Sequence, residues 1–184
     1  MNAVRGRRGD PYSLPRKLIR TFGTRDPFQL AEQLNIHVKF MDTRRQKAFC
    51  KKILNHCFIF INQNLSEQMQ RMSCAHELAH ILLHRDYLDT AAYLMNMELF
   101  DMRNRTEYEA NLFAANLLID DGELLDALRE GKDVVSAAAA FDVNVNLMAL
   151  KLAEMQKSGL PVNVPFVPDR RFLGRIDDCP GAIS

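Results

Sequence analysis

The sequence lacks features that would place it in several common classes of protein. Its cysteines, at positions 50, 57, 74 and 179, are irregularly spaced and form no C-x-x-C pair, which argues against a zinc knuckle and a disulfide framework. The longest apolar runs, such as residues 58–61, are far too short to span a bilayer, and the N-terminus has no apolar stretch of the kind a signal peptide needs. We therefore expect a cytoplasmic protein that does not enter a membrane.

An excess of charge of one sign is also missing. The net charge is +1, so no overall field favours binding to nucleic acid or membranes. A composition that is 47% hydrophobic and 26% charged is typical of a folded domain, and 184 residues suffice for one hydrophobic core. Only the first 25 residues are strongly basic, and this segment is either a solvated arm or a docking surface for a partner.

The periodicity of apolar residues predicts an α+β fold. Helices are expected at residues 14–22, 27–34, 66–84, 106–119, 123–129, 134–141 and 144–155. Strands are expected at residues 36–41, 48–54 and 57–62, with Asn55 and His56 as the turn of a hairpin. Asp26 before Pro27, and Ser66, are predicted helix N-caps. We expect the strands to form a small antiparallel three-stranded sheet packed on a helical core.

The most informative segment is His-Glu-Leu-Ala-His at residues 76–80, inside a predicted helix. On an α-helix His76 and His80 lie on one face about 6 Å apart along the axis, so both imidazoles can reach one metal ion. Glu77 projects about 100° round the helix, close to a water molecule held at an open metal position. Zinc lowers the pKa of such a water to about 7, and a neighbouring carboxylate can take its proton. The pattern predicts a hydrolytic Zn²⁺ site with Glu77 as catalytic base.

A third protein ligand is needed, and His84 is excluded by geometry. On an unbroken helix His84 lies about 12 Å along the axis from His76, out of reach of an ion shared with His80. Residues 81–83 contain no glycine that would break the helix. We expect His84 to lie at the helix end, where it interacts favourably with the helix dipole.

The helix predicted at residues 106–119 offers two acidic candidates. Glu109 shares its side with Asn116, which we expect to face solvent, whereas Glu107 lies on a largely apolar stripe that should pack inward. A buried carboxylate is costly unless its charge is compensated, and a zinc ion would do so. The alternative is a glutamate at the edge of the core that an arginine neutralises. Asn111, one turn further on, is predicted to donate a hydrogen bond to a metal ligand.

These segments resemble the ImmA/IrrE-type metallo-endopeptidases. The resemblance rests on residues 75–84 (AHELAHILLH) and 107–118 (EYEANLFAANLL), with weaker matches at 26–28, 34–36 and 58–62. It spans about residues 14–155. The family commonly has Met-Pro after the Leu-Leu pair, whereas this chain continues with Ile119, Asp120 and Asp121.

The resemblance implies a ligand set and a substrate class. By position, the two histidine ligands fall on His76 and His80, the general base on Glu77 and the third ligand on Glu107. Members of the family are described as cutting helix-turn-helix repressors of mobile elements, phages or stress regulons, so the expected partner is such a repressor. Tyr93, Tyr108 and His84 are chemically able to stabilise the developing oxyanion, and nothing in the sequence chooses among them.

Two further segments have more than one interpretation. Residues 134–155 have the apolar spacing of a helix-turn-helix, but the second helix has few cations to meet phosphates, so we expect packing or partner docking and no direct binding of nucleic acid. The basic residues of the strand at 48–54 and of the segment before it either keep a sheet edge from pairing with itself or bind a substrate as an added strand. These residues are Arg44, Arg45, Lys47, Lys51 and Lys52.

The sequence therefore predicts a zinc-dependent endopeptidase with a specific protein substrate. The competing hypothesis is a regulator without catalytic activity, which uses zinc only for stability and binds a repressor or DNA. We expect a basic flexible tail at residues 1–13, a zincin-like metallopeptidase domain at 14–130, a helical pair packed on it at 131–158 and an extended tail at 159–184.

Overall fold

The computed structural model describes residues 9–43, 46–85 and 105–160. The seven helices within these ranges are α1 (Ser13–Phe22), α2 (Pro27–Gln33), α3 (Glu67–Leu83), α6 (Arg105–Leu118), α7 (Asp121–Arg129), α8 (Val134–Ala140) and α9 (Val145–Lys157). The strands are β1 (Ile36–Met41), β2 (Ala48–Ile53) and β3 (His56–Asn62). Each element lies within two residues of its predicted ends, which confirms the α+β class.

Local sequence explains where the early helices begin. Asp26 accepts a hydrogen bond of 2.8 Å from the backbone N–H of Phe28, and Pro27 occupies the first helical position of α2. Ser66 caps α3 in the same way, because its hydroxyl accepts a hydrogen bond from the N–H of Met69. Both predicted N-caps are confirmed.

The predicted antiparallel sheet is wrong in one pairing. The strand order is β1-β3-β2, and β1 pairs with β3 in parallel, from Ile36 opposite Cys57 to Met41 opposite Asn62. Only β2 and β3 are antiparallel. Alternating polarity identifies a half-buried strand but contains no information on which strand lies next to it or in which direction that strand runs. The sequence therefore could not show that β3 lies between β1 and β2.

The hairpin turn is shifted by one residue from its predicted position. Leu54 and Asn55 form the turn, with backbone φ angles of 47° and 68°, and His56 already begins β3. Two successive left-handed residues give the turn the twist that suits a two-residue hairpin. Asparagine is common in such a position, whereas leucine is not, which is why the sequence pointed to the wrong pair.

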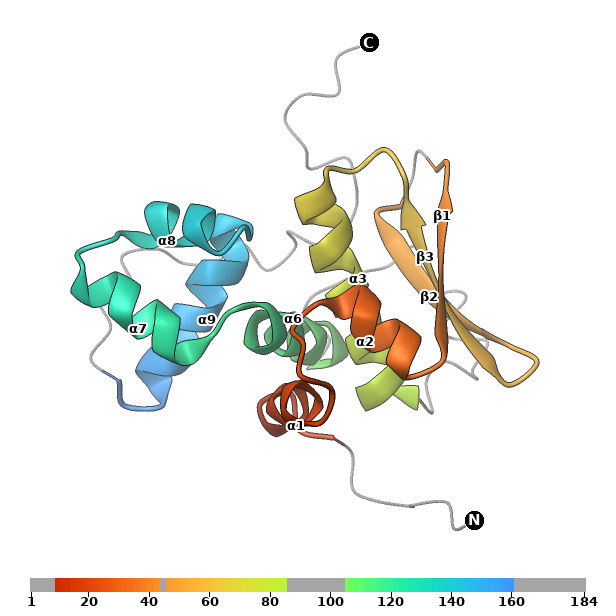
Figure 1. Ribbon diagram of the computed structural model, residues 1–184, viewed down its shortest axis with the longest axis horizontal. Coiled ribbons are helices and arrows are strands. Elements are labelled where there is room, and N and C mark those ends of the chain that lie inside the picture. Colours follow the sequence, from red (N-terminus) through yellow and green to blue (C-terminus); the bar gives the residue numbers. More distant parts are fainter. Residues whose placement is uncertain (1–8, 44–45, 86–104, 161–184) are drawn as a thin grey trace.

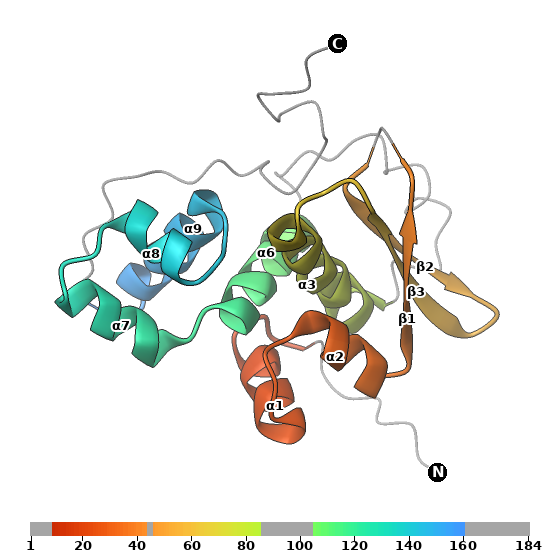
Figure 2. The ribbon, with the colours of Figure 1, turned by 45° about the horizontal axis from the view of Figure 1, so that its top comes forward.

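The elements form successive layers around α3 (Figure 1). One face of the sheet packs on α3, with α2 alongside β1, and α6 packs on the other side of α3. Helices α7, α8 and α9 lie beyond α6, on the side away from the sheet, as the rotated view also shows (Figure 2). The core is continuous through these layers, from Ile59 and Ile61 of β3 through Leu78 of α3 to Phe113 of α6.

The segment that precedes α1 differs from expectation. Residues 1–13 were predicted to be a flexible tail; residues 1–8 lie outside the described residues, but residues 9–12 contact the folded chain. The carbonyl of Pro11 accepts a hydrogen bond from the side chain of Asn116, and the hydroxyl of Tyr12 donates one to Glu154. These partners lie on α6 and α9, so the segment acquires its structure from long-range contacts that composition does not reveal.

The C-terminal pair, α8 and α9, packs against the rest of the fold. The two axes are turned by 111°, within the range of a helix-turn-helix. Eight residues of the thirteen in α9 are buried, and α9 contacts α6 as well as α8. This burial favours the packing role over contact with DNA. The tail predicted at residues 159–184 lies outside the described residues from position 161 onward.

In the described ranges, no single helix is both long enough and apolar enough to cross a membrane.

Candidate metal centre

Two histidines and one glutamate lie in the buried part of helix α3. The exposed fractions of His76, Glu77 and His80 are only 6%, 7% and 4%. Groups of this kind are rarely buried without partners that compensate for lost hydration. Ala75 and Ala79, on the same stretch of helix, are completely buried, so the surrounding elements pack closely on α3. The burial of these three side chains predicts that other groups compensate for the hydration they lose.

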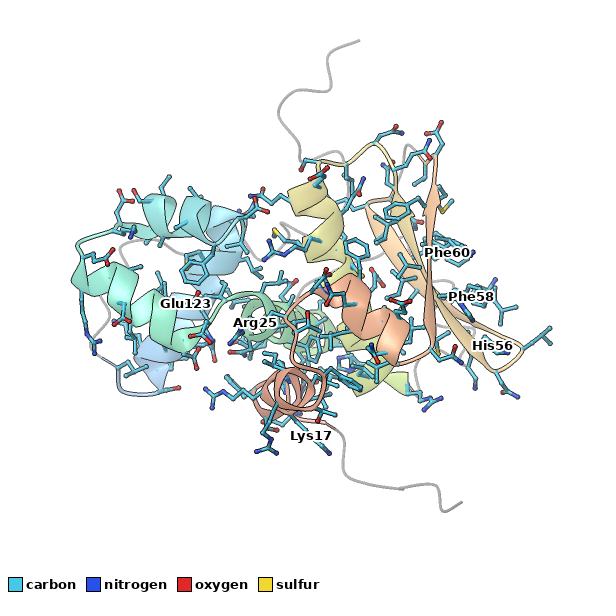
Figure 3. All side chains as sticks on the ribbon, in the orientation of Figure 1. Lys17, Arg25, His56, Phe58, Phe60 and Glu123 are labelled. Atoms are coloured by element: carbon cyan, nitrogen blue, oxygen red, sulfur yellow. The ribbon has the colours of Figure 1, made fainter. Side chains whose placement is uncertain are left out.

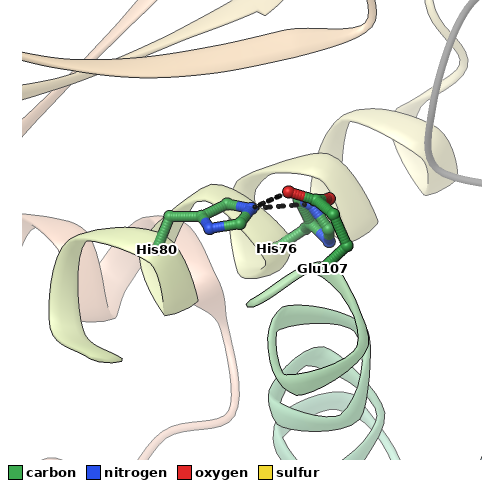
Figure 4. A group of neighbouring side chains, drawn as sticks. All are labelled: His76, His80 and Glu107. Atoms are coloured by element: carbon green, nitrogen blue, oxygen red, sulfur yellow. Dashed lines mark hydrogen bonds and ion pairs between the residues drawn. The ribbon is translucent and has the colours of Figure 1, made fainter. Parts of the chain in front are cut away.

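The first turn of α6 supplies a second glutamate, Glu107, which meets the two histidines (Figure 4). The carboxylate oxygens of Glu107 lie 3.2 Å from the Nε2 atom of His76 and 3.2 Å from the Nε2 atom of His80. The two Nε2 atoms are 3.1 Å apart. The residues predicted as metal ligands are thus brought together across the contact between α3 and α6.

The spacing of these atoms fits one zinc ion. Zinc bonds of about 2.0–2.1 Å at tetrahedral angles separate ligand atoms by roughly 3.3 Å, close to the distances observed here. In the part of the chain that the structure describes, these three form the one group of His, Cys, Asp or Glu residues close enough to hold a metal ion. As ligands, these three residues would leave one coordination position open, which is the arrangement of catalytic and not of structural zinc sites.

Asn111 orients His76. Its side-chain oxygen lies 2.8 Å from Nδ1 of His76, on the opposite side of the ring from the Glu107 contact. An amide oxygen can only accept, so the hydrogen bond places the proton on Nδ1 and leaves the lone pair of Nε2 directed at the ligand group. Asn111 was expected to donate to a ligand; it contacts the predicted ligand but acts as acceptor.

Glu77 is buried yet incompletely satisfied. Its Oε2 atom has no hydrogen-bond partner among the described residues, although the side chain is almost inaccessible to solvent. An unpaired buried carboxylate oxygen is costly and persists at sites where a ligand or water completes it. Its position beside His76 and His80 fits the acceptor that a zinc-dependent hydrolase needs.

The electrostatics of the group favour a cation. Burial by itself raises the pKa of Glu107, but the charge and hydrogen bonds of His80 and His76 outweigh this effect and hold it far below its usual range. Burial also lowers the pKa of His80, and the nearby Glu107 and Glu77 carboxylates more than offset that effect and raise it. Glu107 therefore remains negatively charged at neutral pH, as a zinc ligand must.

His84 takes no part in the group of ligands. It follows α3 as the C-cap, with its backbone N–H bonded to the carbonyl of His80, and its Nε2 atom lies 3.8 Å from Glu109. Glu109 in turn pairs with Arg105 at 2.6 Å and is more exposed than Glu107. Of the two glutamates, Glu107 lies with His76 and His80 and Glu109 does not, and His84 lies at the helix end.

One assumption behind the choice of Glu107 is wrong. Asn116 was expected to face solvent, but it is buried, where its side-chain oxygen accepts a 2.6 Å hydrogen bond from the ammonium of Lys151. Lys151 is itself buried and also pairs with Asp121. A helical projection assigns an asparagine to the solvent side because its side chain is polar. Only the packing of α9 shows that Asn116 has a buried partner, Lys151.

The predicted candidates for oxyanion stabilisation are not brought to the metal centre as a set. The hydroxyl of Tyr108 donates a 2.5 Å hydrogen bond to Glu154 on α9, which commits it to the contact between α6 and α9. Tyr93 lies outside the described residues. The ring of His84 lies 5.5 Å from that of His80.

The end of α6, where the chain departs from the family pattern, lies one residue before its predicted position. The helix ends at Leu118, and Asp120 then caps α7 by accepting hydrogen bonds from Gly122 and Glu123. Asp120 also pairs with Arg25, whose guanidinium donates to the carbonyl of Leu117. The departure at residues 119–121 therefore lies at the opposite end of α6 from Glu107.

Comparison with known proteins gives two kinds of match. Residues 31–153 match the family described as the IrrE N-terminal-like domain. The chain is 32% identical over 116 residues to "Uncharacterized immunity region protein 2" of Bacillus phage phi105, which covers 60% of this chain and 72% of that protein. It is 28% identical over 142 residues to "Metallopeptidase ImmA" of Bacillus subtilis (strain 168), which covers 75% of this chain and 81% of that protein.

Proposed function

Since the chain belongs to the IrrE N-terminal-like domain family of peptidases, we propose that it is a zinc-dependent endopeptidase that cuts a helix-turn-helix repressor of a mobile element, phage or stress regulon. The family and the relative named as a metallopeptidase support a metallopeptidase type of function. The phage relative is named as a protein of an immunity region, which supports a repressor as the substrate class.

One observation carries the proposal. Two histidines and one glutamate converge at 3.1–3.2 Å, while Glu77, next to His76 in the chain, keeps a buried carboxylate oxygen that has no partner among the described residues. A site that served only stability would be closed by four protein ligands and would have no use for an unpaired carboxylate. The arrangement supports hydrolysis over the alternative of a zinc-stabilised regulator.

The roles of the side chains follow from their positions. His76, His80 and Glu107 would hold the zinc ion, which supplies a Lewis acid for a peptide carbonyl and lowers the pKa of water. Asn111 fixes the ring of His76 in the orientation and tautomer that ligation requires. Glu77 would act as a general base that accepts a proton from the water attacking the peptide carbonyl. It would then act as a general acid that returns this proton to the leaving amine.

The test is cleavage of the repressor encoded beside this gene. Wild-type protein is expected to release a new fragment, chelation with EDTA to stop this, and added Zn²⁺ to restore it. Glu77→Gln should retain one zinc per chain by elemental analysis but release no fragment, because the amide cannot accept the proton. Glu109→Gln, a carboxylate-to-amide change outside the ligand group, serves as the matched control.

Two results would contradict the proposal. A Glu77→Gln protein that cuts at the wild-type rate would remove the assigned base. A wild-type protein that binds zinc and represses or derepresses its target without cutting any protein, and whose function survives Glu77→Gln but not unfolding by His80→Ala, would establish the regulator without catalytic activity.

A further inference from the structure

The face of the sheet that points away from α3 is unlike an ordinary solvated surface. It carries a group of side chains that we call the outer face: Phe49, Phe58, Phe60, Lys39, Lys51 and the hairpin residue Leu54. Figure 3 shows Phe58 and Phe60 on the side of the sheet remote from α3. No described helix packs on this side, since α2 and α3 both lie against the other face.

The register of the strands arranges aromatic and cationic side chains in two rows. In one row Lys39 of β1 is opposite Phe60 of β3, which is opposite Phe49 of β2. In the other row Phe58 lies between His37 of β1 and Lys51 of β2. Each central phenylalanine therefore has an aromatic ring on one side and an exposed lysine on the other.

The rings stand side by side on the sheet. The centroids of Phe49 and Phe60 are 4.8 Å apart with planes only 18° from parallel, and those of Phe58 and Phe60 are 6.1 Å apart at 21°. His37 and Phe58 are 4.9 Å apart. Because the rings cover one another's faces, they present edges to the outside. Such a surface suits aliphatic and aromatic side chains of a protein better than nucleobases, which stack on free ring faces.

All the charged side chains of the three strands are basic. The three strands contain no aspartate or glutamate, whereas Lys39 and Lys51 are exposed on the outer face, with His37 and His56 beside them. A complementary partner must therefore be acidic as well as apolar. A second copy of this chain would place lysines against lysines, and two lysines are too few to follow a phosphate backbone.

Leu54 at the hairpin end is the most unusual residue on this side of the molecule. Its side chain is 90% exposed, and its φ of 47° lies in the left-handed region, which costs a leucine about 1–2 kcal/mol. Neither feature helps the fold, because glycine or asparagine would form the same turn with less strain. Strain of this kind concentrates at functional positions. Ile53, next to it, is also exposed.

We propose that the outer face is a docking surface, remote from the metal centre, for an acidic and apolar patch on the protein substrate. The inference rests on the proposed function, and it adds how one substrate is selected. His76 and His80 lie on α3, which packs on the face of the sheet opposite the outer face and contacts the edge strand β2. A folded substrate held by the outer face would therefore reach the metal centre round the edge formed by β2. Exposed apolar surface next to cations is typical of such protein contacts.

The test compares a large and a small substrate. The substrates are the full-length repressor encoded beside this gene and a peptide of about ten residues that spans its cleavage site. Leu54→Gly and the charge reversal Lys39→Glu with Lys51→Glu are expected to raise KM for the full-length repressor about tenfold each, with kcat retained and cleavage of the peptide at the wild-type rate. Val135→Ala and Lys132→Glu, on the other side of the molecule, are the matched controls.

Leu54→Gly also separates docking from folding. Because glycine relieves the strained turn, this variant should unfold at the same or a higher urea concentration than wild type while its KM rises. Binding of the repressor to the Glu77→Gln background, measured by calorimetry, should weaken by the same factor. A loss of binding through misfolding would instead lower the urea midpoint.

The remaining outcomes decide against the proposal or against the function. Unchanged KM and unchanged repressor affinity in both outer-face variants would overturn the docking surface. So would loss of binding to a dT12 oligonucleotide in these variants while repressor affinity is retained. Weakened binding of the repressor without cleavage by the wild type would support the docking surface and overturn the proposed peptidase.

Discussion

Asn111 Oδ1 lies 2.8 Å from His76 Nδ1, and this contact sets the direction of the Nε2 lone pair toward Glu107 and His80. Both side chains are buried, so no solvent competes for the hydrogen bond. The asparagine belongs to the same helix as Glu107, one turn further on. A single helix therefore supplies both a predicted ligand and the group that orients another.

Loss of the Asn111 contact should weaken the metal site without abolishing it. Asn111→Ala leaves Nδ1 of His76 without an acceptor, and removal of such partners typically costs 10–100-fold in metal affinity. Competition with a chromophoric chelator measures the change. Asn111→Asp keeps the acceptor and should remain close to wild type. Equal affinity of the alanine variant and wild type would show that the ring of His76 is fixed by packing alone.

Glu107 and Glu109 form a matched pair for the metal site. Glu107→Gln removes the charge that converges with His76 and His80, so the purified protein is expected to contain much less than one zinc per chain. Glu109→Gln, two residues away and paired with Arg105, should retain the full content. Elemental analysis of both variants after dialysis decides the matter. Retention of zinc by both would eliminate Glu107 as a ligand.

The buried ammonium of Lys151 makes Asp121 important for stability. Asp121→Asn is expected to lower the free energy of unfolding at neutral pH by about 1–3 kcal/mol, because the buried ammonium of Lys151 then loses its ion pair and keeps the neutral partner Asn116. Urea denaturation measures the change. Asp126→Asn removes an exposed carboxylate that pairs with Arg129 and should cost less than about 0.5 kcal/mol. Equal effects of the two substitutions would contradict the role of burial.

Asp121 should also make the free energy of unfolding fall as the pH is lowered. Partial burial raises its pKa, but hydrogen bonds and ion pairs with Lys151 and Arg16 outweigh this and hold the pKa below its usual value. A carboxyl whose pKa is lower in the folded state stabilises the fold above its unfolded pKa, about 3.9, and this contribution is lost as the pH falls through the folded value. Wild type should therefore lose more stability between pH 5 and pH 3 than Asp121→Asn, as urea midpoints would show.

Helix α9 should behave as part of the core. Leu147→Ala is expected to lower the free energy of unfolding by about 2–5 kcal/mol, since Leu147 is completely buried. Val135→Ala on α8, where the side chain is 61% exposed, should change it by less than about 0.5 kcal/mol. A Leu147→Ala protein that is as stable as wild type would show that the pair of helices is not packed as described.

Much of the secondary structure and the candidate ligand residues could be predicted because both depend on local patterns. Asp26 and Ser66 cap helices through neighbours in the chain, and the spacing of His76 and His80 places them on one face of any helix. Glu107 was identified because an apolar stripe must face inward. Asn116 shows the limit of the same reasoning, since a polar side chain is assigned to solvent until a buried partner such as Lys151 is known.

The sequence by itself determined which residues can bind a metal and on which helices they lie, because helical periodicity fixes side-chain direction within an element. Only the tertiary structure decided that α6 brings Glu107 to 3.2 Å from His76 and His80, and that β1 runs parallel to β3. It also left Glu77 with a buried oxygen that has no partner in the part of the chain that the structure describes. It also gathered Phe49, Phe58 and Phe60 on a face of the sheet on which no described helix packs. These relations join positions distant in the chain, and contacts between distant positions follow from how whole elements pack.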